Sequence, residues 1–294
     1  MPQIEIRTAN YEKNRLRAII ETSSDNGAGV GLGSEGCPYK RPDVNLFADA
    51  FEKLDALTVI TPITPQHHYG SVMKYIKDIS HLGSHINLVV NDVGILYGMH
   101  KEDLTNSFDA ITAGRGIVHT SEGCPWVDHL LRDETENIKQ AYLQTNLNYK
   151  RTFDFFSKLG MTEIETDLLP RTVEAVAALD CPVGVHAEYV LVAYARSCHT
   201  ARFYKETPPV CKERCNSRID IELRDMFDLA STPPGFAEPS DELRSIYPPL
   251  QLLGNSIYMK SDCTSIKGID KVIINSDMYK SESLRDIIQK WNAV

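Results

Sequence analysis

Short apolar runs alternate with longer amphipathic stretches along most of this 294-residue chain. Runs of this kind predict buried strands, and we expect nine, at Ile4–Arg7, Gly27–Gly33, Leu57–Ile60, Ile86–Val90, Ala110–Thr112, Thr162–Glu165, Val183–His186, Ser256–Lys260 and Val272–Asn275. Apolar residues at helical spacing predict helices at Tyr11–Glu21, Val44–Leu54, Val72–His81, Val127–Leu159 with a break near Asn146, Arg171–Leu179 and Leu284–Trp291.

This alternation implies parallel strands joined by right-handed crossovers. A closed (β/α)8 TIM-barrel-like single domain over residues 1–294 fits the length better than an open sheet. Residues 198–249 are rich in proline and follow neither period. We expect them to form an irregular insertion over one end of the barrel.

Composition narrows the classes of protein. The net charge of −9 argues against a dedicated nucleic-acid binder, which needs a basic face. No apolar run reaches the length of a membrane span, and the first residues lack the apolar core of a signal peptide. We therefore expect a cytoplasmic protein, in which seven cysteines indicate metal binding better than a disulfide framework.

Three of the cysteines lie close together as Cys-x12-Cys-x3-Cys, at Cys198, Cys211 and Cys215. Thiolates are soft ligands, and a tetrahedral zinc site or a cubane iron–sulfur cluster needs a fourth. Two nearly identical stretches offer it, Ser-Glu-Gly-Cys-Pro at Cys37 and again at Cys124. Ligand chemistry alone leaves both open.

Several reactive residues follow predicted strands, and the chemistry of a barrel sits at the carboxyl ends of its strands. They are Cys37, Asp92, Arg115, Cys124 and His186. Asp92 is either an acid/base group or a turn residue before Gly94. His186 either donates a hydrogen bond to a cluster or substrate, or is a satisfied buried residue.

Two other motifs have structural interpretations. Gly31–Gly36 matches the dinucleotide pattern G-x-G-x-x-G, but no helix follows directly, so we expect a strand and a turn. His81 and His85 are four residues apart, and we expect a helix cap there in preference to a metal pair.

The segment Tyr194–Arg202, followed by Cys211-x3-Cys215, resembles the cluster-binding region of the collagenase-like peptidase family (peptidase family U thirty-two), and in particular its oxygen-independent hydroxylases. Three further places are similar to the family, namely Gly31–Cys37 before the basic pair Lys40-Arg41, Asn91-Asp92-Val-Gly94 and Lys260–Cys263. No Ser/His/Asp set is visible, so the peptidase label carries little mechanistic weight.

The resemblance implies a barrel-like fold with a [4Fe–4S] cluster on Cys37, Cys198, Cys211 and Cys215, which favours Cys37 as the fourth ligand. It implies hydroxylation, without dioxygen, of a small cyclic or aromatic metabolite similar to a ubiquinone precursor, with prephenate as oxygen donor. It also implies a heterodimer with a related subunit, or a homodimer. Asp92, Arg115 and His186 are then the candidates for substrate handling. The alternative is a non-catalytic partner braced by the cluster or by zinc.

Overall fold

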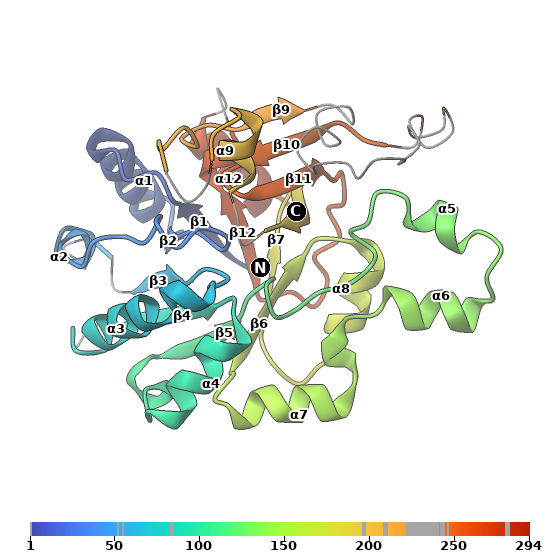
Figure 1. The fold of residues 1–294 in the computed structure, drawn as a ribbon, viewed down its shortest axis with the longest axis horizontal. Coiled ribbons are helices and arrows are strands. Elements are labelled where there is room, and N and C mark those ends of the chain that lie inside the picture. The colour runs from blue at the N-terminus through green and yellow to red at the C-terminus, as the bar shows by residue number, and fades with distance from the viewer. Residues whose placement is uncertain are drawn as a thin grey trace.

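The structure is a computed structural model that describes residues 2–294 except 52, 55, 83–84, 196–197, 208–210, 222–240, 242–244, 246 and 280–282. Eight parallel strands close into a barrel in the order β1-β12-β7-β6-β5-β4-β3-β2 (Figure 1). They are β1 Gln3–Thr8, β2 Gly29–Gly33, β3 Leu57–Ile60, β4 Ile86–Val90, β5 Ala110–Ala113, β6 Glu163–Asp167, β7 Val183–His186 and β12 Lys271–Asn275. The predicted TIM-barrel-like fold is therefore confirmed.

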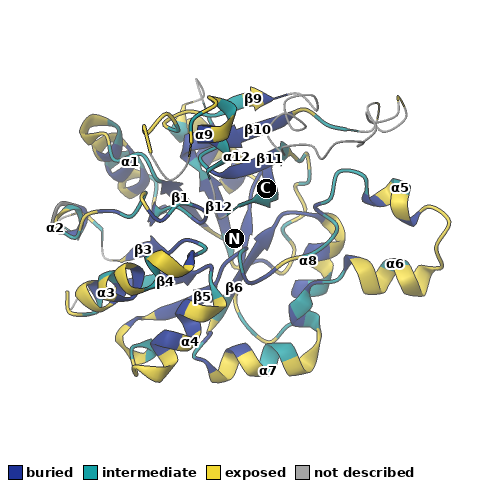
Figure 2. Cartoon of the chain, in the orientation of Figure 1, coloured by how far each residue is buried: buried dark blue, intermediate teal, exposed yellow. Residues whose placement is uncertain are grey.

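Helices cover the outside of the barrel and turn their buried sides toward it (Figure 2). They are α1 Lys13–Asp25, α2 Asn45–Phe51, α3 Tyr69–Ser80, α4 Val93–Lys101, α7 Lys150–Lys158, α8 Pro170–Val176 and α12 Leu284–Asn292, with 3-10 turns η1 Gln66–His68, η2 Thr105–Ser107, η3 Asn146–Asn148 and η4 Ser276–Met278. The main apolar core lies between these helices and the strands. Helices α5 Val127–Leu131 and α6 Glu136–Leu143 project away from the barrel (Figure 1) and share a small apolar cluster of their own. In the described part of the chain, no helix is long and apolar enough to cross a bilayer.

A second, antiparallel sheet lies over one end of the barrel (Figure 1). Its order is β8-β11-β10-β9, with β8 Tyr189–Tyr194, β9 Ile219–Ile221, β10 Leu250–Leu253 and β11 Ser256–Lys260. The expected strand Ser256–Lys260 thus forms, but it is wrong to place it in the barrel. The chain passes from the carboxyl end of β7, at His186, almost directly into β8. The small sheet therefore covers the carboxyl ends of the barrel strands.

The predicted irregular insertion falls partly outside the described residues. Its described part is more ordered than expected, because it contains the short helix α9 His199–Phe203 and strand β9. The small sheet has a core of its own around Leu252 and Ile257. These elements, with the loops around Cys211, form the wall of the candidate site.

The inside of the barrel is unusually polar. Glu5 and Arg7 of β1 point to the same side of the strand and are both buried. Their register partners on β2 are Gly29 and Gly31. A Cβ atom on Gly31 would collide with the Arg7 side chain, so the glycine leaves room for an ion pair where most barrels carry branched apolar residues.

Candidate functional site

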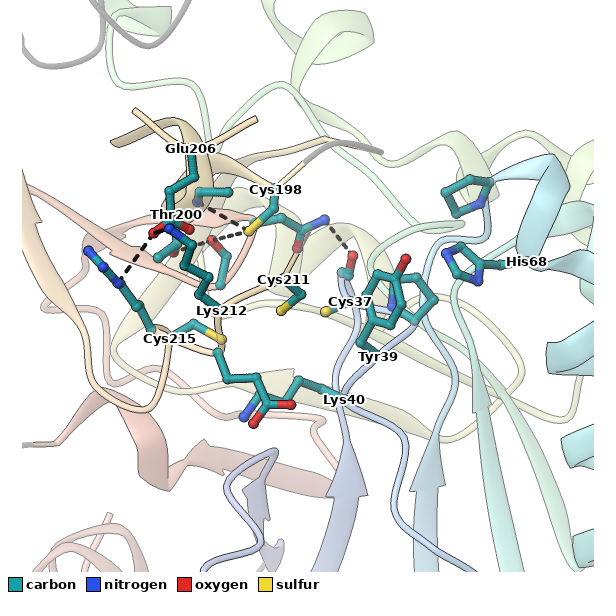
Figure 3. A pocket seen from close by; sticks show the side chains of 18 of the residues that line it. Cys37, Tyr39, Lys40, His68, Cys198, Thr200, Glu206, Cys211, Lys212 and Cys215 are labelled. Atoms are coloured by element: carbon teal, nitrogen blue, oxygen red, sulfur yellow. Dashed lines mark hydrogen bonds and ion pairs between the residues drawn. The ribbon is translucent and has the colours of Figure 1, made fainter. Parts of the chain in front are cut away.

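The four cysteines that the resemblance names line one cavity of about 520 Å³. Cys37 lies in the turn after β2, Cys198 is the residue before the first turn of α9, and Cys211 and Cys215 lie in the segment before β9. In Figure 3 their sulfur atoms face one central space. Cys211 is solvent-exposed, and the other three are half-buried.

Backbone amides point at two of these sulfurs. The Ala201 N–H donates to Cys198 Sγ at 3.5 Å. Burial raises the pKa of the Cys37 thiol, while hydrogen bonds from the backbone of Tyr39 and Lys40 lower it. Such N–H donors stabilise bound thiolates, and they tune the potential of a metal cluster.

Burial also raises the pKa of Cys215, to about 11, although the Lys40 ammonium acts in the opposite direction. A thiol of that pKa is protonated at neutral pH. It becomes a thiolate when a metal replaces the proton. A raised pKa argues against an activated nucleophilic cysteine, whose pKa is lowered.

The turn that carries Cys37 is held in place by the side chain of Asn255, a residue late in the sequence. Asn255, between β10 and β11, donates from its side-chain amide to the carbonyls of Gly36 and Ala195. A Cβ atom on Gly36 would collide with Asn255. The Cys37 turn and the strand leading to Cys198 are therefore held by one side chain.

The dinucleotide interpretation of Gly31–Gly36 is not supported, because β2 leads into this turn and the next helix begins only at Asn45. Gly33 has φ +134°, and a Cβ atom there would collide with the Ile60 carbonyl. The segment is the strand and close backbone turn that the sequence predicts.

Cys124 lies elsewhere. It packs beside Val127, Leu131 and Leu143 in a separate small cluster. The Glu122 carboxylate two residues before it accepts from the Thr172 backbone N–H at 2.7 Å, which fastens this loop to α8. The two similar motifs therefore occupy different surroundings, and Cys37 is the one that shares a cavity with the other three cysteines.

A second, narrower cavity of about 60 Å³ adjoins the first at the barrel mouth, and Cys37, Cys215, Arg115 and His186 all contribute to its wall. Arg115 follows β5 and His186 ends β7, so the structure brings together two of the three substrate-handling candidates. Both side chains are buried.

Carboxylates surround these two residues. Arg115 donates to Glu35 Oε2 at 2.7 Å and to Asp167 Oδ1 at 2.6 Å. His186 Nε2 lies 3.3 Å from both Glu35 Oε1 and Glu165 Oε2. We call Glu35, Arg115, Glu165, Asp167 and His186 the mouth network.

The barrel ion pair extends this network inward. Arg7 Nη1 donates to Glu165 Oε2 at 2.7 Å, and Arg7 Nε donates to Glu5 Oε1 at 2.6 Å. Burial opposes the charge of Glu165, but Arg7 outweighs it and holds the pKa of that carboxyl well below its usual range. Buried charges thus run from the strands of the barrel to the turn that bears Cys37.

The pKa values of Glu35 and His186 both lie below the ordinary values of these groups. Burial raises the pKa of Glu35, but the Arg115 guanidinium and His186 reverse this and leave it below its usual value. Burial, and then Arg115, lower the pKa of His186 against the pull of Glu35 and Glu165. His186 is therefore neutral near pH 7 and can accept or donate a proton at the mouth.

Asp92 does not join the mouth network. Its side chain caps α4, accepting from the N–H groups of Gly94 at 2.8 Å and Ile95 at 3.2 Å, and also from Thr64 at 3.1 Å. Of the two interpretations that the sequence leaves open, these contacts favour the structural one.

The histidines are placed as follows. His81 is the residue that ends α3, as predicted, and His85 pairs with Asp109 at the surface. His67 and His68 line the cysteine cavity, where His68 packs edge-to-face on Tyr39.

Sequence reasoning missed Glu35, Glu165, Asp167 and Arg7 as members of a site. A usable signal was present, because charged residues alternate within β1 and β6. Glycines face Glu5 and Arg7 on β2, and Gly184 of β7 faces Glu165. Charges inside short barrel strands are costly unless they are paired.

One set of three metal-ligand types within the described residues has ligand atoms that all lie within 4.8 Å of one another: Glu35, Glu165 and His186. Both carboxylates already bind arginines, and a cation there would compete with those pairs. No three of the four cavity cysteines have sulfur atoms that all lie within 4.8 Å of one another.

No family model, curated protein or solved structure matches the chain.

Proposed function

We propose that this chain is an iron–sulfur protein of an oxygen-independent hydroxylation system, with a [4Fe–4S] cluster on Cys37, Cys198, Cys211 and Cys215. The observation that carries the proposal is that these four thiols, from segments more than 150 residues apart in the sequence, line one cavity. Four soft donors and converging amide N–H groups fit a cubane cluster.

The four thiols can hold either a cluster or a single zinc ion, and the described residues show no preformed zinc tetrahedron among them. Zinc–sulfur bonds of about 2.3 Å in a tetrahedron bring the four sulfurs to about 3.8 Å from one another. Within the described residues, no three of these cysteines have sulfurs that are all within 4.8 Å of one another. A cubane places irons and sulfides between its thiolates and therefore suits wider spacing.

The narrow cavity at the barrel mouth supports a reaction beside this group. It joins Cys37 and Cys215 to Arg115 and His186. Arg115 is a fixed donor, and His186, neutral near pH 7, offers its ring as a proton acceptor or hydrogen-bond donor. When bound, the cluster would supply one-electron chemistry, while these two side chains orient the substrate and manage its protons.

The reaction class rests on the resemblance to the collagenase-like peptidase family. We propose hydroxylation of a small cyclic or aromatic metabolite, similar to a ubiquinone precursor, with prephenate as the oxygen donor. An oxygen donor accepts the two electrons that leave the substrate when C–H becomes C–OH. The same resemblance supports a pair with a related subunit, or a homodimer.

The first test is strictly anaerobic purification with iron, sulfide and zinc assays and an absorption spectrum. We expect about four irons and four sulfides per chain and a broad band near about 400 nm that bleaches on reduction with dithionite. The Cys37→Ala variant should lose the band, and the matched Cys124→Ala variant should keep it. About one zinc and no sulfide per chain would rule the redox proposal out.

The second candidate is a non-catalytic partner braced by the same group. It is favoured by the sparse secondary structure of the described residues 204–218, which carry two of the thiols. A bracing group would raise the melting temperature without turnover by the chain, either alone or with its partner subunit. Anaerobic turnover that is lost in Arg115→Gln, while the iron content is kept, would decide for the enzyme.

A further inference from the structure

The mouth of the cysteine cavity carries positive charge on an acidic molecule. Among the described ionisable residues that line the cavity, the cations are Lys40, Lys212 and Arg214 and the carboxylates are Glu206 and Glu213. The chain as a whole has a net charge of −9. We call Lys40, Lys212 and Arg214 the basic rim.

Most of this charge faces solvent. The Glu206 side chain is only 9% exposed and lies 3.3 Å from both Lys212 Nζ and Arg214 Nε, whose side chains are 55% and 49% exposed. Lys40 is half-buried, and its Nζ donates to the neutral Asn216 at 2.9 Å. Glu206 therefore positions two cations, and together with Glu213 it leaves a net charge of +1 on these five lining residues.

Stabilisation of the cysteine thiolates does not account for all three cations of the basic rim. Of the three cations, Lys40 acts on Cys215 and lowers the pKa of its thiol against burial. Lys212 and Arg214 instead contact Glu206, and Arg214 also stacks 4.9 Å above the Tyr204 ring. Both residues line the same cavity as the exposed Cys211.

We propose that the basic rim is the docking surface for an acidic one-electron carrier protein of ferredoxin-like charge. The inference rests on the proposed function. The carrier would lose one electron and the bound cluster would gain it; this is a priming step, because the oxygen donor accepts the two electrons of the hydroxylation itself. Cys211 is the exposed one of the four thiols, and opposite charges speed and orient the encounter. Nucleic acid fits less well, because tight phosphate binding draws on about six to ten cations.

The test uses the reconstituted holoprotein and a reduced, acidic plant-type [2Fe–2S] ferredoxin in a stopped-flow spectrometer. We expect the second-order rate constant for cluster reduction to fall at least about tenfold between about 20 mM and 300 mM NaCl. The rim variant Lys40→Gln/Lys212→Gln keeps Arg214 on the buried Glu206. It should reduce about threefold to tenfold more slowly at low salt.

The matched control is Lys74→Gln/Lys150→Gln, which removes the same charge from exposed lysines on α3 and α7. It should change the rate less than about twofold. The dissociation constant of oxidised ferredoxin, measured at both salt concentrations, gives a second readout and should weaken in the rim variant only.

The outcomes separate the two proposals. If no cluster assembles, the proposed function fails. If the cluster assembles and dithionite reduces it, while the ferredoxin rate ignores both salt and the rim variant, the docking inference alone is wrong. If a single-stranded 20-mer oligonucleotide binds the rim more tightly than ferredoxin does, the surface belongs to nucleic acid and the inference is overturned.

Discussion

Gly36 is a residue at which a single atom decides the shape of the cysteine cavity. Its backbone carbonyl accepts from Asn255, and the Asn255 side chain fills the space where a Cβ atom would stand. The Cys37 turn can therefore approach β10 and β11 only because this position has no side chain.

We predict that Gly36→Ala destabilises the protein by about 1–3 kcal/mol, the usual cost of overpacking, and lowers the iron content on reconstitution. Gly70→Ala in α3 is the control, since a Cβ atom there meets nothing within 4 Å and alanine favours a helix. The control should be neutral or up to about 1 kcal/mol more stable in urea denaturation. Equal losses in both variants would contradict the role of Asn255.

At this scale the sequence located the reactive residues better than their partners. The positions of Arg115 and His186 at strand ends followed from the barrel rule. The partners Glu35 and Glu165 lie far from them in the chain, Glu35 being 80 residues before Arg115. Local patterns do not encode such pairings, which barrel closure creates.

Helix α4 is an element that the hydrophobic pattern of the sequence did not predict. Its nine residues include Gly94 and Gly98, which weaken the helical pattern, and its first turn depends on the Asp92 carboxylate. The sequence leaves two interpretations of Asp92 open, a turn residue and an acid/base group. The observed contacts assign it to the cap of α4.

We predict that Asp92→Ala costs about 1–2 kcal/mol in the free energy of unfolding, because the Gly94 and Ile95 amides lose their acceptor. Asp92→Asn keeps an oxygen at the cap and should cost less than half of that. Urea denaturation measures both. A catalytic carboxylate would give the opposite pattern, with Asn as stable as the wild type yet inactive in turnover.

The small sheet is the main element that the sequence did not predict. Tyr189–Tyr194 is apolar, but it follows β7 after only two residues, and Glu188 makes that turn with φ +64°. Alternation of strands and helices offers no place for such a strand. The short β9 lies within the proline-rich residues 198–249 and β10 follows them directly, and periodicity cannot be measured over strands of so few residues.

For the whole molecule, the buried charges determine how stability depends on pH. The pKa of His186 lies below its ordinary 6.5, so below pH 6.5 the unfolded chain binds a proton that the folded chain does not. The pKa values of Glu35 and Glu165 lie below 4.5, so their contribution is present above pH 4.5 and is lost as the pH falls through their folded values.

We therefore predict that stability falls on acidification in two stages, one beginning near pH 6.5 and a steeper one below pH 4.5. The urea midpoint measured at intervals between pH 8 and pH 3 would show both. His68 and His199 also have lowered pKa values, so His186→Asn should diminish the first stage and leave the second. A midpoint that stays constant between pH 7 and pH 5 would contradict the prediction.

The order of the cysteines along the chain has a consequence during synthesis. Cys37 leaves the ribosome with the second strand, but Cys198, Cys211 and Cys215 follow only after the seventh, and β12, which closes the barrel, comes later still. A truncated chain that stops before residue 198 contains Cys37 but none of the other three cysteines of the cavity. Any group that needs all four thiols is thus inserted into a nearly finished polypeptide, so its delivery is a maturation step and cannot guide the first half of folding.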